Sequence, residues 1–503
     1  MTDTEALIKR ATMAGVRLWT SEGELCFRAP AGSLGEELRA QLRAHRSEVI
    51  ALLDQARQSE ASTEAVPILT FYRELWWKIR EGVLDVTFTN ATHWLARVEG
   101  ALDPQVLEEA IRQLVRRHSI LCGGVADVEG EPHFVFDRTV RLISTEVTEA
   151  DSSDEAISRM ISELVWRPFD VHGEPFFRPF LIKFAHERHI VGFVLHHLVG
   201  DAWSVMTLRT ELVEAYLAAT RGSTQPLKVH RPQYATYVTE LNQWIQSPDF
   251  VRRVRYWREH LKSAHPSRLI PNYVPAAETQ GIMRAEPFSL DAECTKRLRQ
   301  IAAEHGTTLF AVFAAAKLYT LRRSLGVSQL LLLTMFSGRT SPEYMDTVGS
   351  MQNQLPIQVQ IDDDISIEKL AKRVQRTCTS SYGEQIPYHY ARQLLSELGI
   401  AEHLAELNFN DTHSLRSRAA APPVQTGLKF TTLSVGEWPI SKSTPRYVPG
   451  HSLIVKADST LSGVMVYLDC LYAPTNIESF LHSLRRLLTR AAAHPNRPLA
   501  ELF

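Results

Sequence analysis

The feature that most constrains this chain is an apolar segment that ends in two adjacent histidines and leads into a helix. The run Ile190–His196 is apolar and rich in β-branched residues, which predicts a buried strand, and His197 follows it directly. Adjacent side chains of a strand point to opposite faces, so only one of His196 and His197 can face a cavity. Burial of an imidazole without a hydrogen-bond partner is unfavourable, so a buried histidine is expected to be hydrogen-bonded or to serve a function. The segment therefore predicts a site at the end of a strand.

His197 is the candidate for the reactive ring, because it lies nearer the loop and because histidine can exchange a proton near neutral pH. A neutral ring could accept a proton from an attacking amine or hydroxyl group, or hold that group by a hydrogen bond. Asp201 could orient an imidazole, or it could bind an arginine that fixes the loop. Trp203 and Ser204 then open a helix predicted over Ser204–Ala219.

Two other interpretations of the segment are open. A histidine on an apolar strand is most often a hydrogen-bonded core residue, although a tandem pair followed by an aspartate makes that interpretation weaker. A metal site would need ligands beyond His197 and Asp201, and the sequence has neither an HExxH pattern nor a carboxylate-rich helix. We therefore expect no metal site.

Composition limits the class of protein. The 503 residues exceed what one core usually holds, so two to four domains are expected. A net charge of −2 gives no basic field for nucleic acid or for an anionic membrane. The cysteines are far apart and lack CxxC spacing, which suits a reducing cytoplasm without disulfides or structural zinc: Cys26, Cys122, Cys294, Cys378 and Cys470. No apolar run approaches the roughly 20 residues that span a bilayer, and no signal peptide is visible, so a cytoplasmic location is expected.

The first residues predict a separate small unit. Residues 1–57 indicate a helix, a β-hairpin with strands at 16–20 and 25–28, and a second helix from Leu34 to Arg57 with a possible break at His45. So short a unit has a small core, and we expect a partner or a second copy to cover its remaining apolar surface. Residues 58–66 lack large apolar side chains and are predicted to be a linker.

Helix and strand signals alternate from Pro67 onward. The chain lacks GxGxxG, GxxxxGK[ST] and GxSxG patterns, so nucleotide binding and α/β-hydrolase chemistry have no local support. Thr475 and Glu478 form a capping-box pattern that predicts a last helix over about 476–493. The other predicted elements are helices at 103–118, 250–261, 291–305 and 309–323 and a strand at 329–336.

The pattern HHxxxDxxS that begins at His196 resembles the signature of nonribosomal peptide synthetase condensation domains, which belong to the chloramphenicol-acetyltransferase-like acyltransferases. The similarity extends over nearly all of residues 67–503. The segments that carry it are Glu99–Asp103 (family pattern G-x-L-D), Arg117–Leu121 (R-H-E-x-L), Tyr256-Trp257 (Y-W), and Ser337–Arg339 with Val348–Asn353 (G-R … V-G-x-F-x-N).

This resemblance implies a mixed α/β fold of two chloramphenicol-acetyltransferase-like lobes in a V-shaped pseudo-dimer, residues 67–240 and 241–503, with Gly463–Tyr467 as a strand that bridges them. It implies a tunnel that donor and acceptor carrier proteins enter from opposite faces, their phosphopantetheine arms supplying the thioesters, with no cofactor on this chain. Its catalytic residues would be His197 for amine positioning or deprotonation, Gly200 or nearby amides for oxyanion binding, and His196 and Asp201. Structural support would come from Arg339 as the partner of Asp201, and from Trp203, Ser204 and Asn410.

Several positions depart from the family pattern. Ala202 replaces the glycine after the motif aspartate, Cys122 replaces an arginine and Met351 replaces a phenylalanine, while Leu404–Phe409 takes the place of an R-D-x-S-R element. Three functions stay open: an amide-forming condensation domain, a starter-type domain that N-acylates from acyl-CoA or an acyl carrier, and a silent platform that only recruits carrier proteins.

The first unit resembles the docking domain at the start of the tubulysin synthetase subunit, through Leu18-Trp19 and the R-A-P-x-G pattern at Arg28–Gly32. This resemblance implies recognition of the acidic C-terminal tail of an upstream subunit, and a possible homodimer. A hairpin edge can add a strand from an extended peptide, and a positive surface suits a negative tail: Arg17, Arg28, Arg39 and Arg43. The alternative is a solvated helix face beside an ordinary edge strand.

Overall fold

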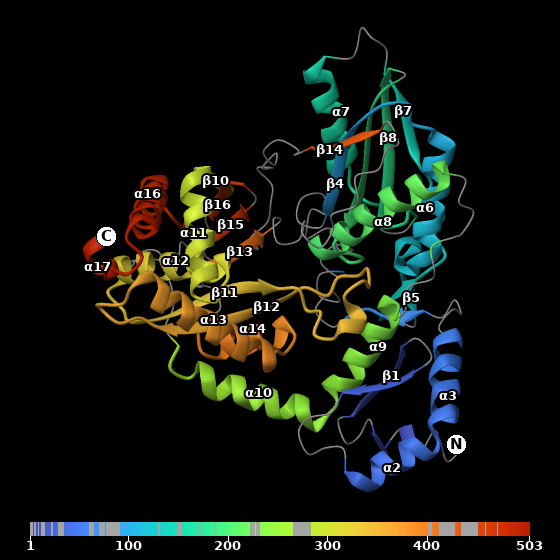
Figure 1. The fold of residues 1–503 in the computed structure, drawn as a ribbon, viewed down its shortest axis with the longest axis horizontal. Helices are drawn as coiled ribbons and strands as arrows, with labels where there is room; N and C mark the ends of the chain where they lie inside the picture. Colours follow the sequence, from blue (N-terminus) through green and yellow to red (C-terminus); the bar gives the residue numbers. More distant parts are fainter. Residues whose placement is uncertain are drawn as a thin grey trace.

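The structure is a computed structural model, shown in Figure 1. It describes these residues: 4, 7–8, 10–11, 16–21, 24–28, 35–59, 65–69, 76, 91–128, 131–147, 153–170, 173–185, 187–221, 227, 232–264, 283–400, 405–411, 428–433, 451–457, 459–469 and 471–503.

The first lobe is built on a sheet of five strands in the order β14-β4-β9-β8-β7. These strands are β4 (Ala91–Glu99), β7 (Ile143–Glu146), β8 (Phe177–Ala185), β9 (Arg188–His196) and β14 (Lys429–Thr432). Helices α6 (Pro104–Arg117) and α8 (Ala202–Thr220) pack together, while α7 (Asp154–Trp166) lies toward the second lobe (Figure 1). Strand β9 is buried at every residue except the first, as its unbroken apolar run predicted.

The second lobe is built on a sheet of six strands in the order β10-β16-β15-β13-β11-β12. These strands are β10 (Met283–Leu290), β11 (Gln329–Phe336), β12 (Asn353–Gln360), β13 (Ala405–Asp411), β15 (His451–Ala457) and β16 (Leu461–Leu468). Alternate leucines of β11 enter two separate cores, Leu330 and Leu332 in one and Leu331 and Leu333 in the other. Burial on both faces explains why this strand is apolar at nearly every position.

Helices cover both faces of this second sheet. The larger core includes residues of α11 (Ala292–Glu304), α12 (Leu309–Leu325), α13 (Ile367–Gly383), α16 (Pro474–Ala493) and α17 (Leu499–Leu502). The smaller core includes residues of α10 (Pro248–Leu261) and α14 (Tyr388–Glu397). The helices predicted over 103–118, 250–261, 291–305 and 309–323 are thereby confirmed to within two residues at each end.

Smaller elements complete the first lobe and lead to the second. Helix α9 (Tyr234–Ile245) leads from the first lobe to α10, and a sheet of three strands has the order β3-β6-β5. Its strands are β3 (Val66–Pro67), β5 (Gly124–Val128) and β6 (Glu131–Val135), and two 3-10 turns are η1 (Ser119–Cys122) and η3 (Pro342–Tyr344).

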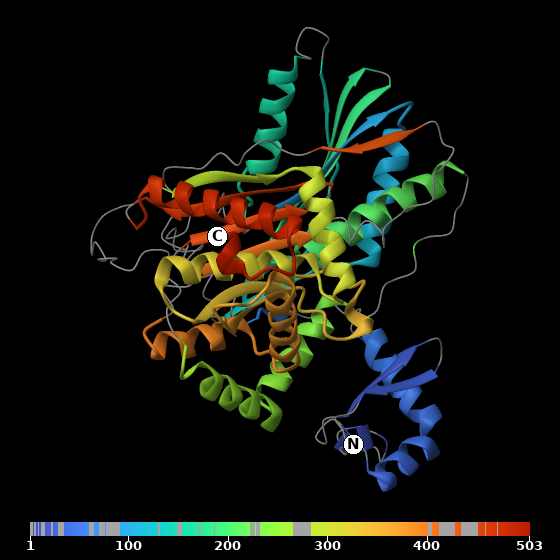
Figure 2. The same ribbon diagram turned by 60° about the vertical axis from the view of Figure 1, so that its left-hand side comes forward.

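The N-terminal unit has the predicted hairpin, with β1 (Arg17–Ser21) antiparallel to β2 (Glu24–Arg28), and it is the blue unit at the lower right of Figure 2. The predicted break at His45 separates α2 (Glu36–Ala44) from α3 (Arg46–Ser59). Helix α3 extends two residues into the predicted linker, most of whose other residues lie outside the described part. Among the described residues of this unit, Leu7, Leu42 and Val49 belong to one buried apolar cluster.

Two sequence predictions were wrong. Gly463–Tyr467 does not bridge the lobes, because these residues belong to β16 and pair with β10 and β15 in the second lobe's own sheet. The crossing strand is β14, which pairs with β4 from Lys429↔Glu99 to Thr432↔Ala96. The last helix begins at Pro474 with Ala473 as its N-cap and no side-chain cap, so the predicted capping box does not form there. A proline at the first helical position already has the helical φ and needs no amide partner.

Candidate functional site

His196 is the last residue of β9, and its side chain is fully buried. Its Nδ1 accepts a hydrogen bond from the Leu198 amide at 3.1 Å, so the proton of the neutral ring is on Nε2. The ring stacks on Phe176, with 4.7 Å between centroids, and meets the edge of Phe169 at 5.6 Å. Burial lowers the pKa of His196 to about 3, with a smaller effect from His197, which keeps the ring neutral. His196 is the inward-facing member of the pair and shapes the turn.

His197 is the first residue of the turn after β9, and its side chain is half-buried. Its Nδ1 lies 3.2 Å from the carbonyl oxygen of Gly200, and because a carbonyl can only accept, Nδ1 carries the proton. Nε2 of the neutral ring therefore has the lone pair. Burial lowers the pKa of His197, although the Gly200 carbonyl and the Asp201 charge oppose the shift. A neutral imidazole with a fixed tautomer can act as a hydrogen-bond acceptor or a general base.

Asp201 is the N-cap of α8 rather than a partner of the His197 ring. Its Oδ1 accepts hydrogen bonds from the amide and the hydroxyl of Ser204, both at 2.8 Å. A carboxylate at this position satisfies the free amides of the first turn and interacts favourably with the helix dipole. The carbonyl oxygen of Gly200, and not Asp201, is therefore the hydrogen-bond partner that orients the His197 ring.

The same carboxylate binds the second lobe. Nη1 of Arg339 lies 2.8 Å from Oδ2 of Asp201, and Nη2 lies 3.2 Å from Oδ1. The amides of Met351 and Gln352 also donate to Oδ2, at 3.1 and 3.2 Å. Although burial alone would raise the pKa of Asp201, Arg339 and Ser204 hold it below its ordinary value. With its oxygens occupied in this way, Asp201 fixes structure and is not placed to accept a proton.

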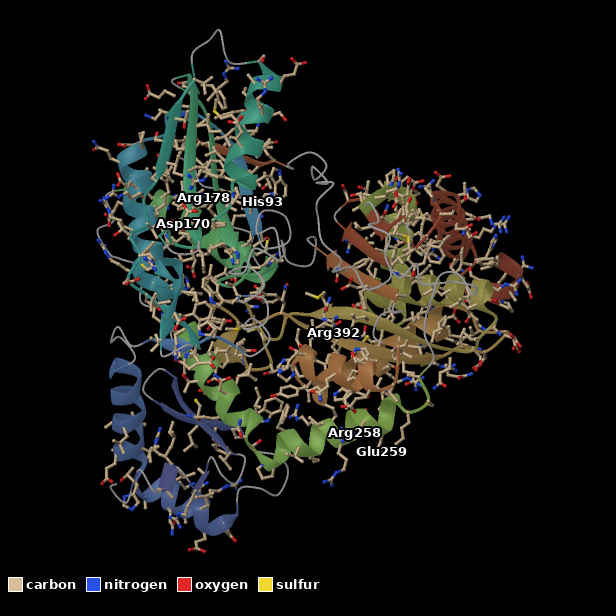
Figure 3. All side chains as sticks on the ribbon, turned by 180° about the vertical axis from the view of Figure 1, so that it is seen from behind. His93, Asp170, Arg178, Arg258, Glu259 and Arg392 are labelled. Atoms are coloured by element: carbon tan, nitrogen blue, oxygen red, sulfur yellow. The ribbon has the colours of Figure 1, made fainter. Side chains whose placement is uncertain are left out.

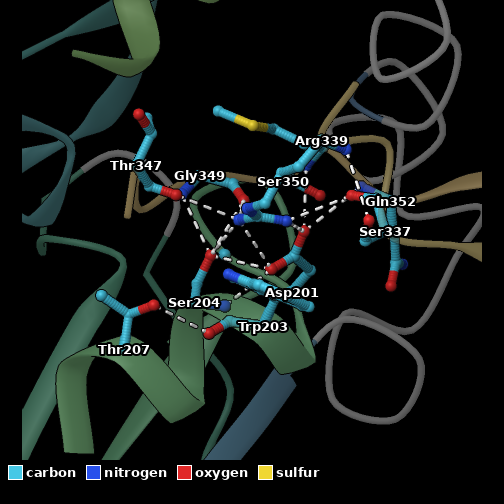
Figure 4. A network of polar contacts seen from close by, with 12 residues as sticks. Asp201, Trp203, Ser204, Thr207, Ser337, Arg339, Thr347, Gly349, Ser350 and Gln352 are labelled. Carbon is cyan, nitrogen blue, oxygen red and sulfur yellow. Dashed lines mark hydrogen bonds and ion pairs between the residues drawn. The ribbon is translucent and has the colours of Figure 1, made fainter. Parts of the chain in front are cut away.

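Arg339 is 2% exposed and donates hydrogen bonds to the loop between β11 and β12 (Figure 4). Its guanidinium donates to the carbonyl oxygens of Ser337, Thr347 and Gly349 at 3.0–3.3 Å. Gly338 makes the turn possible, because its φ is +69° and an added Cβ would lie 1.6 Å from a backbone oxygen. The arginine therefore shapes the loop and attaches it to Asp201.

Further bonds fasten this loop to the first lobe. The Trp203 indole donates to the Met345 carbonyl at 2.6 Å, and the Ser204 hydroxyl oxygen, whose proton goes to Asp201, accepts a hydrogen bond from the Gly349 amide at 3.0 Å. Three apolar side chains of the loop also belong to the first lobe's core: Tyr344, Val348 and Met351. His197 therefore lies close to the place where the loop of the second lobe is bonded to the first lobe.

The structure brings His196, His197, Gly200, Asp201 and Arg339 together, with Trp203 and Ser204 beside them. Asn410 lies elsewhere, in β13 opposite Lys456 of β15, and its side chain is outside the described part. In the N-terminal unit Arg39 and Arg43 are exposed, while the side chains of Arg17 and Arg28 are not described. Sequence reasoning missed Thr347, Met345 and the Gln352 amide as site partners.

Within the described residues, no group of three or more histidine, cysteine or carboxylate side chains could hold a metal ion. Among the helices of that part, none combines the length and the apolar character that a membrane span requires. Cys26, Cys122, Cys294 and Cys378 are free thiols there.

Comparison with known protein families decides what the chain is similar to. The family described as the condensation domain matches residues 87–503. The chain belongs to this family. A second family, the TubC N-terminal docking domain, matches residues 5–55. The N-terminal hairpin unit and the two lobes are thus separate domains of known families.

Curated relatives of this condensation domain are much longer proteins. One of the linear gramicidin synthase proteins from Brevibacillus parabrevis is 27% identical over 415 residues, which is 81% of this chain and 8% of that protein. Another protein of the same synthase is 25% identical over 455 residues, which is 87% of this chain and 6% of that protein. The chain therefore spans less than a tenth of either relative.

Solved structures confirm the fold expected from the sequence, that of condensation domains with their chloramphenicol-acetyltransferase-like lobes. The first condensation domain of the calcium-dependent antibiotic synthetase, in complex with a substrate analogue, aligns with a TM-score of 0.68 at 17% identity, covering 88% of this chain and 99% of that one. The X-domain from teicoplanin biosynthesis aligns with a TM-score of 0.69 at 19% identity, covering 88% and 98%.

Three residues that depart from the family pattern can be located in the structure of this condensation domain. Ala202 is exposed at the first position of α8, so it leaves the Asp201 cap intact. Met351 is buried in the first lobe's core at 2% exposure while its amide binds Asp201. Cys122 is half-buried at the end of η1, and burial, with a smaller effect from Asp137, raises the pKa of its thiol.

Proposed function

We propose that this condensation domain forms an amide bond between two carrier-bound substrates of a nonribosomal or hybrid assembly line. The donor is an acyl or peptidyl thioester, and the acceptor is an aminoacyl amine. Each is carried on the phosphopantetheine arm of a partner carrier protein, and the chain itself supplies no cofactor. The observation that carries the proposal is the fixed tautomer of His197, whose Nδ1 is tied to Gly200 so that Nε2 has the lone pair.

The acceptor amine attacks the thioester carbonyl carbon while its N–H is held by Nε2 of His197. The imidazole takes the amine proton as the C–N bond forms, and returns it to the departing thiolate sulfur as the C–S bond breaks. The products are an amide and a free thiol, so atoms and charge balance. Gly200 or a neighbouring amide is proposed to bind the oxyanion. Much of the rate enhancement is proposed to come from alignment of two tethered reactants.

The lowered pKa of His197 supports this role, because the ring stays neutral near pH 7 and can accept a hydrogen bond. The Asp201–Arg339 ion pair supports it in a different way. It fixes the first turn of α8, which immediately follows the Gly200 carbonyl that holds His197. Asp201, Arg339, Ser204 and Trp203 thus act by positioning.

The N-terminal unit is proposed to dock on the C-terminal tail of an upstream synthetase subunit. Exposed Arg39 and Arg43 on α2 would face an acidic tail, and an edge of the β1–β2 hairpin could pair with an extended peptide. A homodimer through this unit and a cytoplasmic location are further proposals.

A second candidate is a silent recruiting platform. The X-domain from teicoplanin biosynthesis has a similar fold and was solved in complex with OxyB. Ala202 in place of the motif glycine is the sequence feature that favours this candidate, and a starter-type acylation is the third possibility.

One product assay separates these functions. The protein is incubated with a panel of acyl and aminoacyl carrier proteins and, separately, with acyl-CoA donors, and the loaded carriers are analysed by intact mass spectrometry. On the acceptor carrier, the mass of the acceptor plus the donor's acyl group supports amide formation when the donor is carrier-bound, and its appearance only with acyl-CoA donors indicates the starter type. Carrier binding without any new mass would contradict the proposal and favour the platform.

A further inference from the structure

Arg178 is a buried cation of the first lobe that the proposed chemistry does not use. It is the second residue of β8, opposite Val194 of β9, and it is 3% exposed (Figure 3). Its guanidinium donates to the carbonyl oxygens of Leu164, Arg167 and Pro168 at 3.3, 2.9 and 3.0 Å. These are carbonyls at the end of α7 and in the turn that follows. Arg178 therefore binds this end of α7 to the sheet that carries His196.

The charge of Arg178 is compensated locally. Nη2 lies 2.7 Å from Oε1 of Glu174, whose other oxygen is 2.8 Å from exposed Arg167. Burial lowers the pKa of the guanidinium and Glu174 opposes the shift. Because an arginine pKa is normally above 12, the group stays charged. One carboxylate thus has two arginine partners, one buried and one exposed.

The guanidinium of Arg178 is also connected by aromatic contacts to His196 at the end of β9. Its carbon lies 4.1 Å from the ring centroid of Phe169, and Phe169 meets the face or edge of both Phe176 and His196. His196 is therefore enclosed between Phe176 and Phe169, and Arg178 fixes the position of Phe169. Any rotation of the His196 ring would break its bond from the Leu198 amide, which shapes the turn that holds His197.

We infer that Arg178 is a positioning residue for His197, acting through Phe169 and His196. A planar guanidinium can stack on a ring and bind several carbonyls at once, which the ammonium of lysine cannot reproduce. The inference rests on the proposed function of His197. It adds a residue that touches neither substrate nor the reacting ring.

The test compares Arg178→Lys with Arg167→Gln. The first variant keeps the buried charge and loses the planar stack, while the second breaks the exposed ion pair to the same Glu174 and leaves Phe169 in place. With the loaded carrier panel, Arg178→Lys should lower kcat about tenfold and leave KM within about twofold, because small misplacements of catalytic groups have large rate effects. Arg167→Gln should change neither. Unchanged kcat in folded Arg178→Lys, or an equal loss in Arg167→Gln, would overturn the inference.

A second variant, Phe169→Leu, tests whether Arg178 acts through Phe169. If Arg178 acts through Phe169, the loss of kcat in the double variant should be close to that of the worse single variant, since coupled residues are not additive. Multiplication of the two losses would contradict the path.

A readout without turnover keeps this inference separate from the proposed function. Diethylpyrocarbonate acylates neutral imidazole, and peptide mass spectrometry reports the reaction rate of His197 against pH. Arg178→Lys should shift the midpoint of that profile or change its plateau at least threefold, whereas Arg167→Gln should reproduce the wild-type profile. Identical profiles in all three proteins would overturn the positioning role, even if the wild-type chain forms no amide.

Discussion

Asp201 and Arg339 lie 138 residues apart and form a buried, two-pronged ion pair that joins the start of α8 to the loop of the second lobe. Their side chains are 1% and 0% exposed. Loss of one partner from a buried pair leaves the other charge unpaired, which typically costs about 3–5 kcal/mol. Asp201→Asn or Arg339→Gln should therefore lower the free energy of unfolding strongly.

The combined variant, Asp201→Asn with Arg339→Gln, should be less destabilised than the sum of the two single changes, because no unpaired charge remains. Urea unfolding followed by tryptophan fluorescence measures all three. Strict additivity, or single losses below about 1 kcal/mol, would show that the pair does not hold the lobes.

Acid should destabilise the folded state through His196. Its pKa is about 3 in the folded protein against an ordinary value of 6.5, so between these values the unfolded chain binds more protons. Stability from this group is complete above pH 6.5 and is lost as pH falls toward 3, by up to about 1.4 kcal/mol per pH unit. His93, with a pKa of about 4, adds to the effect.

His196→Phe should flatten the dependence of unfolding free energy on pH between about 7 and about 5, because phenylalanine fits an aromatic cluster and cannot be protonated. His482→Ala, at an exposed position of α16, should leave the slope unchanged. Equal slopes for His196→Phe and the wild type would mean that the buried ring is not the acid-sensitive group.

Charge reversal on α2 should weaken docking. Arg39→Glu with Arg43→Glu should reduce the affinity for acidic C-terminal peptides of neighbouring synthetase subunits about tenfold or more, and added salt should weaken the wild-type complex. Isothermal titration calorimetry measures both effects. Lys262→Glu reverses an exposed charge after α10 and is the control. If that control weakens binding equally, only net charge matters and the docking surface is elsewhere.

The local patterns of the sequence predicted the local structure well. Strand β9, the deeper burial of one of the two histidines, and the helix after Asp201 all follow from residue spacing, and the structure contains each of them. Arg339 could be named only through the family resemblance, because its partner is remote in sequence.

Other features had no local signal. The crossing strand β14 is only four residues long, and its place in the first lobe depends on pairing with β4, which is remote in sequence. The longer β16 has a stronger strand pattern, so the sequence favours it for the crossing position instead. The amides of Met351 and Gln352 bind Asp201 through the backbone, so their side chains carry no trace of this role. The Trp203–Met345 bond likewise depends on a fold that brings residues 142 positions apart together.

The central claim is that His197 Nε2 receives the acceptor amine. Its most direct test is the single-turnover rate of amide formation, measured by quenched flow and intact mass spectrometry, for the wild type, His197→Ala and the exposed control His482→Ala. The claim predicts a loss of about 10²–10⁴-fold in His197→Ala, with unchanged carrier affinity and a wild-type rate in the control. A His197→Ala protein that forms the amide at the wild-type rate would contradict it.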